Sequence, residues 1–409
     1  MKKLLVLILA VIVTFPAFFS CKDDAVDVPF SKNSIEENKV QIEEEGLALL
    51  DKMDAMKNLS AMNTLMDLNA LMYGAPEEEY YGVAGMVKKV VEQKSGRSLI
   101  KKIESKTTVT DPYYTFIGIE AGIYTWNSSI SEFEWTASAN ELTFKYPSAG
   151  STTNNTIMKV SNLKYDELTY ESETSYMMTS LNVLMTVSGS EQLSLEMRAE
   201  FDDDGMPISY RSEFEVKEGY SFTETFTNSG SKAKFDAVYG FDGEDLFMAH
   251  MESSGDFTYD NMYNLENPEN EDQLDEFLDK ANMWIQAGNL KFAAIVDFNN
   301  YIKQKSSKFP NDIVGATMED ADAMTKIMND NIKATLMFAK EKKAIAKGLF
   351  YSYEYDEYYY PGEYSVGLKF VFADDSSLDQ SFIETGFEDL LSAYEEFMMA
   401  MQDSYYQLM

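Results

Sequence analysis

The chain has 409 residues, and its 34 Lys and Arg against 69 Asp and Glu give a formal net charge of −35 at pH 7. So acidic a surface repels phosphate backbones, which excludes the usual DNA- and RNA-binding classes. The 45% apolar and 13% aromatic residues exclude an intrinsically disordered chain and allow a large buried core.

The counts of cysteine and histidine exclude several catalytic and metal sites. Cys21 is the only cysteine, so the chain cannot form an internal disulfide. His250 is the only histidine, which excludes any site within one chain that needs two histidine ligands. The sequence has no Gly-x-Ser-x-Gly motif, phosphate-binding loop or dinucleotide-binding glycine motif. We therefore predict no enzyme, no catalytic residue, no metal site and no cofactor, and interpret His250 as a structural strand residue.

Residues 1–20 have the layout of a secretory signal peptide. Lys2 and Lys3 form a positive start, and an uninterrupted apolar run follows from Leu4 to Val13. A membrane-spanning helix needs about twenty apolar residues, so this run is too short to be one. We predict that the segment is removed on export.

The residues that close this segment indicate a lipid anchor. Ser20-Cys21 resembles the lipobox of type II signal peptides, in which the cysteine is lipidated and becomes the mature N-terminus. Phe18 and Phe19 depart from the aliphatic and small residues that are commoner there. The resemblance implies a lipoprotein held to a membrane through Cys21, and the several acyl chains of such an anchor make attachment stable.

A short acidic run after the anchor points to the cell surface. Lys22, Asp23 and Asp24 resemble the surface-export signal of Bacteroidota lipoproteins. The alternative is a solvated tether in which any charged residues would serve. We expect residues 21–33 to form a lipid anchor and flexible tether on the outer membrane, exposed at the cell surface or, alternatively, facing the periplasm.

We predict a single α+β domain over residues 34–409, beginning with a helical segment over residues 34–76. Ile35, Ile42, Leu49 and Met56 recur every seven residues, and Gly74 with Pro76 provides a stop signal. The seven-residue spacing allows a coiled coil, but a helix packed on its own domain is favoured.

Residues 113–257 have the period of β-strands and predict an antiparallel sheet of about seven to ten strands. Asp203-Asp204-Gly205 forms a turn between two segments in which every second residue is apolar. These apolar residues are Leu193, Leu195, Met197, Ala199 and Phe201, followed by Ile208, Tyr210, Phe214 and Val216. The acidic turn resembles the start of a calcium loop, but the strand pattern resumes at once, which favours a plain hairpin.

Residues 270–409 are expected to be helices with one β-hairpin. Leu274, Phe277, Leu278, Ala281, Trp284 and Ile285 predict a helix that ends at Gly288. A second helix is expected from Thr317, whose spacing to Asp320 resembles a capping box, to about Lys347 before Gly348. A hairpin turning at Pro361-Gly362 and a final helix capped by Ser377 complete the chain. The predicted fold is a large antiparallel β-meander sheet covered on its apolar face by N- and C-terminal helices.

The predicted hairpin carries an unusual density of tyrosines. Aromatic rows stack on sugar rings or fill protein interfaces, because tyrosine offers a broad contact area at low entropic cost. Tyrosine is also a good strand former, so part of the set can be ordinary core. The candidate binding residues are Tyr351, Tyr353, Tyr355, Tyr358, Tyr359, Tyr360 and Tyr364.

Two resemblances concern the body of the chain. The segments Gly122–Trp126, Phe133–Trp135 and Leu142–Pro147 look like a segment of Bacteroidota lipoproteins, a family that implies no activity and no functional residues. A broad one-sided sheet with covering helices is also similar in outline to the lipoprotein-carrier (LolA-like) half-barrels, and this likeness of architecture does not fix a function.

Three functions remain open at this point. The first is a non-enzymatic surface lipoprotein that binds a glycan or another macromolecule, or serves as a structural accessory. The second is a periplasm-facing carrier that holds a lipid or other hydrophobic ligand between the sheet and the methionine-rich helices. The third is a glycoside hydrolase that uses a pair of carboxylates. The expected partners are the membrane, through lipidated Cys21, and a glycan, protein or lipid ligand, with no nucleic acid.

Overall fold

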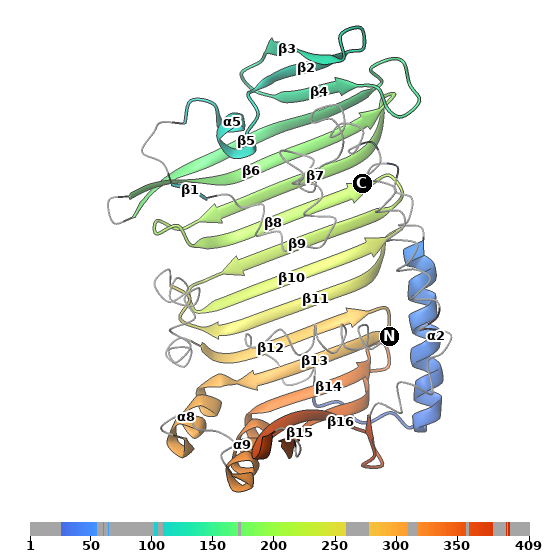
Figure 1. Ribbon diagram of the computed structural model, residues 1–409, viewed down its shortest axis with the longest axis vertical. Coiled ribbons are helices and arrows are strands. Elements are labelled where there is room, and N and C mark those ends of the chain that lie inside the picture. The colour runs from blue at the N-terminus through green and yellow to red at the C-terminus, as the bar shows by residue number, and fades with distance from the viewer. Residues whose placement is uncertain are drawn as a thin grey trace. The chain divides into compact units, whose positions relative to one another are not determined.

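The computed structural model describes residues 26–54, 60, 64, 102–104, 109–170, 173–258, 278–309, 317–356, 360–378, 390 and 392 (Figure 1). The described residues are mostly antiparallel β-sheet, with 55% of them in strands and 21% in helices. Cys21 and the run Lys22–Asp24 lie outside the described residues, as do residues 1–20, which are predicted to be a signal peptide. The expected fold class is therefore confirmed at the level of a large antiparallel sheet with few helices.

The chain divides into two compact units. The first comprises Met1–Asp51, Asn228–Asp236 and Phe247–Glu396, and the second comprises Lys52–Thr227, Ala237–Leu246 and Phe397–Met409. Strands β10 (Lys232–Phe241) and β11 (Glu244–Gly255) each contribute residues to both units. The two units are described separately below.

The second unit is a strand meander with a small three-stranded extension. In the extension, β2 pairs antiparallel with β3 and parallel with β4. From β4 to β9 each strand pairs antiparallel with the next in the chain, and the short β1 pairs with β6. The strands are β1 (Lys102–Glu104), β2 (Gly122–Asn127), β3 (Glu132–Ala137), β4 (Leu142–Tyr146), β5 (Thr156–Tyr170), β6 (Glu173–Val187), β7 (Ser190–Phe201), β8 (Pro207–Val216) and β9 (Tyr220–Asn228). The strand period predicted for residues 113–257 is confirmed.

The hairpin predicted around the acidic turn is β7–β8. Leu193 faces Val216 and Leu195 faces Phe214 across the ladder, so the apolar side chains of both strands share one face. The carboxylate of Asp202 accepts hydrogen bonds from the backbone N–H groups of Asp204 and Met206, at 3.1 and 2.8 Å. The acidic run is therefore an ordinary strand connection, as predicted.

The same unit includes a short helix, α5 (Pro112–Ile117), whose ends follow the usual capping chemistry. The Asp111 carboxylate accepts hydrogen bonds from the backbone N–H groups of Tyr113 and Tyr114, and Pro112 occupies the first turn. Gly118 ends the helix with a φ of +87°, a left-handed conformation that favours glycine. Within the helix, the side chain of Tyr113 is buried and that of Tyr114 is exposed to solvent.

In the part that the structure describes, the first unit has the further strands β12 to β17 and the helices α2, α8 and α9. β11 to β17 pair antiparallel in chain order. The elements are α2 (Ile35–Asp54, which enters the second unit at Lys52), β12 (Leu278–Ala287), β13 (Leu290–Asp297), α8 (Phe298–Lys308), α9 (Met318–Asn331), β14 (Ile332–Phe338), β15 (Lys343–Asp356), β16 (Tyr360–Val371) and β17 (Ser377–Leu378). Among the described residues, no helix is both long and apolar enough to cross a membrane.

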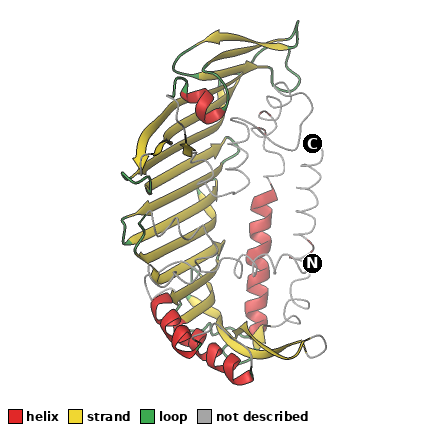
Figure 2. Ribbon diagram, turned by 60° about the vertical axis from the view of Figure 1, so that its left-hand side comes forward, coloured by secondary structure: helices red, strands yellow, loops and turns green. Residues whose placement is uncertain are grey.

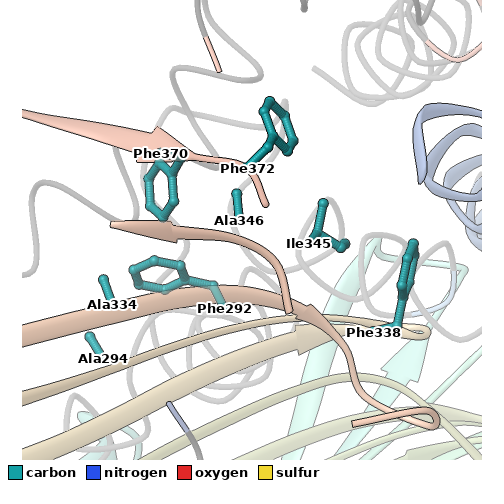
Figure 3. Packing of buried hydrophobic residues seen from close by; sticks show 8 residues of the cluster. All are labelled: Phe292, Ala294, Ala334, Phe338, Ile345, Ala346, Phe370 and Phe372. Carbon is teal, nitrogen blue, oxygen red and sulfur yellow. The ribbon is translucent and has the colours of Figure 1, made fainter. Parts of the chain in front are cut away.

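A phenylalanine-rich cluster forms the core of the first unit. It draws on β13, β14, β15 and the end of β16, and Ile35 and Ile42 of α2 pack against it. This contact confirms that the N-terminal helix packs on its own domain and does not form a coiled coil. The cluster consists of Phe292, Ala294, Ala334, Phe338, Ile345, Ala346, Phe370 and Phe372 (Figure 3).

Helices α8 and α9 form a second, smaller cluster. Met324 and Ile327 of α9 pack with Phe309, which follows α8, and Val366 of β16 lies against them. Figure 2 shows the two helices side by side at one end of these strands. The expected start of α9 is confirmed, because the Thr317 hydroxyl accepts a hydrogen bond from the Asp320 backbone N–H at 3.1 Å.

For residues 270–409, one predicted helix is a strand, the end of a second is wrong, and so is the start of a third. The segment expected to be a helix ending at Gly288 is strand β12, and Gly288, with a φ of +56°, forms the turn into β13. The helix that begins at Thr317 ends at Asn331, so Gly348 lies inside β15. Ser377 begins β17 and does not cap a helix; beyond Leu378, only Leu390 and Ser392 of the expected final helix fall among the described residues, and both are helical.

The prediction of a flexible tether over residues 21–33 is wrong from Val26 onward. Val26 and Val28 are only 2% and 8% exposed, and Val28 packs against Met337 and Ala344. The segment also bonds to the sheet through its backbone. Ser31 N–H donates to Ala344 O at 2.7 Å, Ala344 N–H donates to Pro29 O at 3.0 Å, and the Thr335 hydroxyl donates to Val26 O at 2.9 Å. These contacts, with an isolated parallel bridge between Phe30 and Ala344, dock the segment against β15 of the first unit.

Candidate functional site

The candidate site lies on the β15–β16 hairpin. In its register, Leu349 faces Lys369, Tyr351 faces Gly367, and Tyr353 faces Ser365. Because strand side chains alternate between faces, these residues share one face of the hairpin, together with Lys347. We call this the lysine–tyrosine face, and it consists of Lys347, Leu349, Tyr351, Tyr353, Gly367 and Lys369.

The side chain of Tyr351 packs directly over the backbone of Gly367 on the neighbouring strand. A Cβ atom on Gly367 would come within 2.9 to 3.1 Å of two ring carbons and the hydroxyl oxygen of Tyr351, so this side chain occupies the space that a residue-367 side chain would fill. The side chain remains 39% exposed. Tyr353 is its neighbour, with ring centroids 5.6 Å apart and an interplanar angle of 36°. One tyrosine ring therefore packs on the backbone while part of it remains open to solvent.

Two lysines on this face are each held over an aromatic ring. Lys369 Nζ lies 5.3 Å from the centroid of Tyr351, and Lys347 Nζ lies 5.3 Å from the centroid of Phe30. Both distances are within the range of a cation–π interaction. Phe30 belongs to the N-terminal segment, so the docking of that segment positions one of the lysines.

The opposite face of the hairpin packs against the rest of the unit. Leu368 and Phe370 join the phenylalanine cluster, and Val366 joins the cluster under α9. The side chain of Asn329 in α9 accepts from Phe350 N–H at 2.8 Å and donates to Phe350 O at 3.0 Å, so it satisfies the backbone of β15. These contacts fix the register of the hairpin and thereby decide which tyrosines lie on the lysine–tyrosine face.

The seven predicted tyrosines do not form one site. Tyr351 and Tyr353 are brought together, while Tyr364 faces Glu354 on the opposite face. Tyr355 and Tyr360 lie in the strands, and Tyr358 and Tyr359 lie outside the described residues. The predicted turn at Pro361-Gly362 is wrong, because both residues lie within β16. Lys347, Gly367 and Lys369 were not predicted, although their alternation with the tyrosines would have indicated them had the register been known.

His250 lies in strand β11, which confirms that it is a strand residue. Its Nδ1 is 2.6 Å from the Asp236 carboxylate, and its ring stacks on Trp284 with centroids 5.4 Å apart. Burial acts to raise the pKa of Asp236, but hydrogen bonds from His250 and Lys234 outweigh it, so the pKa lies below its ordinary value. Lys291 makes a cation–π contact with the same tryptophan, with its Nζ 3.8 Å from the centroid of the Trp284 ring.

The first unit also has a shallow hollow along α2. It is lined by Glu36, Glu37, Val40, Gln41, Glu44 and Glu45. Four glutamates make this lining acidic, in contrast to the mainly apolar lining typical of lipid and small-molecule pockets. In the described ranges, no group of three or more His, Cys, Asp or Glu side chains could hold a metal ion.

Comparison with known proteins gives the lysine–tyrosine face no precedent. No family model, curated protein or solved structure matches this chain.

Proposed function

We propose that this protein is a lipid-anchored, non-enzymatic glycan-binding protein of the outer membrane, exposed at the cell surface. The observation that carries the proposal is the Tyr351 ring, which packs on Gly367 and stays partly open to solvent beside Tyr353. Sugar rings present apolar C–H faces, and an aromatic ring fixed in advance binds them with little loss of conformational entropy.

We further propose that the helices cover the apolar face of the sheet, which leaves the lysine–tyrosine face as the binding surface. The contacts of Ile35 and Ile42 with the phenylalanine cluster support this arrangement, as does the contact of Val366 with the α9 cluster. The side of the hairpin that carries Leu368 and Phe370 would then hold the scaffold rigid. A binding site on rigid strands is more accurately positioned than one on loops.

The binding proposal is tested by substituting Tyr351 in the mature chain, with Cys21→Ser to prevent lipidation. The chain should bind at least one polysaccharide in a panel of neutral and acidic polymers, measured by calorimetry. Tyr351→Ala should weaken that binding by about 1–2 kcal/mol, or roughly tenfold, because it removes the stacking surface. Gly367→Ala should also weaken binding, because its methyl group displaces the ring while the tyrosine remains.

Tyr114→Ala is the matched control, since Tyr114 is 60% exposed on α5 of the other unit. Its binding should equal that of the unsubstituted chain. A panel in which no polymer binds would contradict the proposal, and so would a bound polymer whose affinity is the same for Tyr351→Ala.

The location proposed for the protein is tested separately on intact cells. If Cys21 is lipidated and Lys22–Asp24 acts as an export signal, added protease should digest the protein while a periplasmic control survives. Replacing Asp23 and Asp24 with asparagine should then protect the protein from digestion without removing the anchor. Protection of the unsubstituted protein until the envelope is opened would contradict surface exposure.

A further inference from the structure

We infer that the glycan bound by the lysine–tyrosine face is anionic and carries carboxylate groups, as a uronic-acid polymer does. The inference rests on the proposed function and adds the chemical class of the ligand. It is carried by two lysines that flank the tyrosine platform on neighbouring strands.

Lys347 and Lys369 are close enough to act on the same ligand. Lys369 faces Leu349 directly, and Lys347 lies two residues before Leu349 on β15, so the two lysines are diagonal neighbours. Such neighbours are separated by roughly 7–8 Å in an antiparallel pair. That spacing separates the two Cα atoms, and two lysine side chains on one face of neighbouring strands favour a ligand with negative charge.

The two lysines have no carboxylate partner among the described residues. Lys347 and Lys369 are instead placed over the rings of Phe30 and Tyr351. Lys333, on neighbouring β14, differs from them because its Nζ lies 3.2 Å from the Asp27 carboxylate of the N-terminal segment. The positive charge at Lys347 and Lys369 therefore remains available to a ligand.

This local charge is opposite to that of the chain as a whole. With 69 acidic residues against 34 basic ones, most of the surface repels an anionic polymer. On β15, Glu354 lies on the opposite face of the hairpin, and its carboxylate accepts a hydrogen bond from Gly362 N–H. A carboxylated chain would therefore be attracted to this face and repelled elsewhere, which gives specificity as well as affinity.

The residues also form a line that suits an extended chain. Lys347 and Tyr353 are six positions apart on β15, a distance of roughly 20 Å along a strand. Tyr351 lies between them, next to Lys369. A polymer stacked on Tyr351 and Tyr353 would thus place its carboxylates beside the two lysines.

The test compares polygalacturonate and hyaluronan with the neutral polymer dextran, using the mature chain with Cys21→Ser at low and high salt. The two acidic polymers should bind at least tenfold more tightly than dextran at low salt, and added salt should reduce that difference, because salt screens exposed charges. The double variant Lys347→Gln and Lys369→Gln should lose roughly tenfold in affinity for the acidic polymers. Its affinity for dextran should be unchanged.

A second double variant, Lys280→Gln with Lys326→Gln, is the matched control. Both of these lysines are exposed and lie on other elements, where they pair with Asp297 and Asp330. The control should leave binding of every polymer unchanged. An equal loss in both double variants would show that only net charge matters and would overturn the inference.

The outcomes separate this inference from the function on which it rests. Tight, Tyr351-dependent binding of dextran, with no preference for acidic polymers, would keep glycan binding and overturn the anionic class. No binding of any polymer would overturn both the proposed glycan binding and the anionic class of the ligand. Lysine-dependent binding to vesicles of anionic phospholipid, without binding to polysaccharide, would instead assign the face to the membrane.

Discussion

Replacing Phe338 with alanine should lower the free energy of unfolding by about 4 kcal/mol, since large-to-small changes of a buried phenylalanine cost about 3–5 kcal/mol. Phe338 is 1% exposed and lies at the end of β14 within the phenylalanine cluster. The change removes a ring from a packed region that several strands share, so the surroundings can close over the cavity only in part. Urea unfolding followed by far-ultraviolet circular dichroism measures the effect.

Leu349→Ala is the control for this experiment, because Leu349 is exposed on the lysine–tyrosine face of neighbouring β15. It should change the free energy of unfolding by less than about 1 kcal/mol. A loss below about 1 kcal/mol for Phe338→Ala would show that the cluster is not a packed core.

The second large effect is expected from removing residues up to Ser31, leaving the cap of α2 intact. The free energy of unfolding of the first unit should fall by about 4 kcal/mol, because two buried valines contribute about 2 kcal/mol each. The deletion also leaves the Thr335 hydroxyl and the Ala344 N–H without their partners, Val26 O and Pro29 O. Comparing urea unfolding of the shortened chain with that of the mature chain gives the difference.

The matched control removes only residues 21–25, so that the chain starts at Val26. This form should unfold at the same urea concentration as the mature chain with Cys21→Ser. Equal stability of all three forms would contradict the docking of Val26–Ser31 on the unit and would restore the flexible tether.

Strands β7, β8 and β9 could be predicted because one face of each is buried and apolar while the other is more exposed and polar. In β7 and β8 the alternation places Leu193 and Leu195 opposite Val216 and Phe214, and the turn residues between them fix the register. Local sequence alone was enough for such an element.

The segment around β12 could not be predicted for a physical reason. Ala281 and Asn282 are neighbours that point to opposite faces, yet they are only 2% and 5% exposed. A strand buried on both faces loses its alternation, so the spacing of its apolar residues also fits a helix. Pairing with β11 and β13 decides the outcome, and that information is not local.

The docking of the N-terminal segment was missed because its partners are distant in the sequence. Val28 contacts Met337, and Pro29 bonds to Ala344, about three hundred residues further along the chain. A run of a few residues with one proline carries no pattern that distinguishes a docked strand from a solvated tether.

The candidate site was predicted in part. The sequence identified the tyrosines, but it did not give the register of the β15–β16 hairpin, which decides the face on which they lie. A turn centred on Pro361-Gly362 would place Tyr351 opposite Phe372, a residue of the core. The actual register places Tyr351 opposite Gly367, on the other side of the strand from the core. Because a shift of one residue reverses the faces of a strand, the tyrosines could be found from the sequence but their surface could not.

The central claim is that a polysaccharide stacks on Tyr351 and Tyr353, and hydroxyl-radical footprinting with mass spectrometry tests it most directly. The mature chain with Cys21→Ser would be oxidised with and without polygalacturonate, with Tyr114 as an exposed internal reference. The proposed function predicts that the polymer protects Tyr351 and Tyr353 from oxidation and leaves Tyr114 unchanged. Equal oxidation of Tyr351 in the free and saturated protein, with protection at another surface, would contradict it.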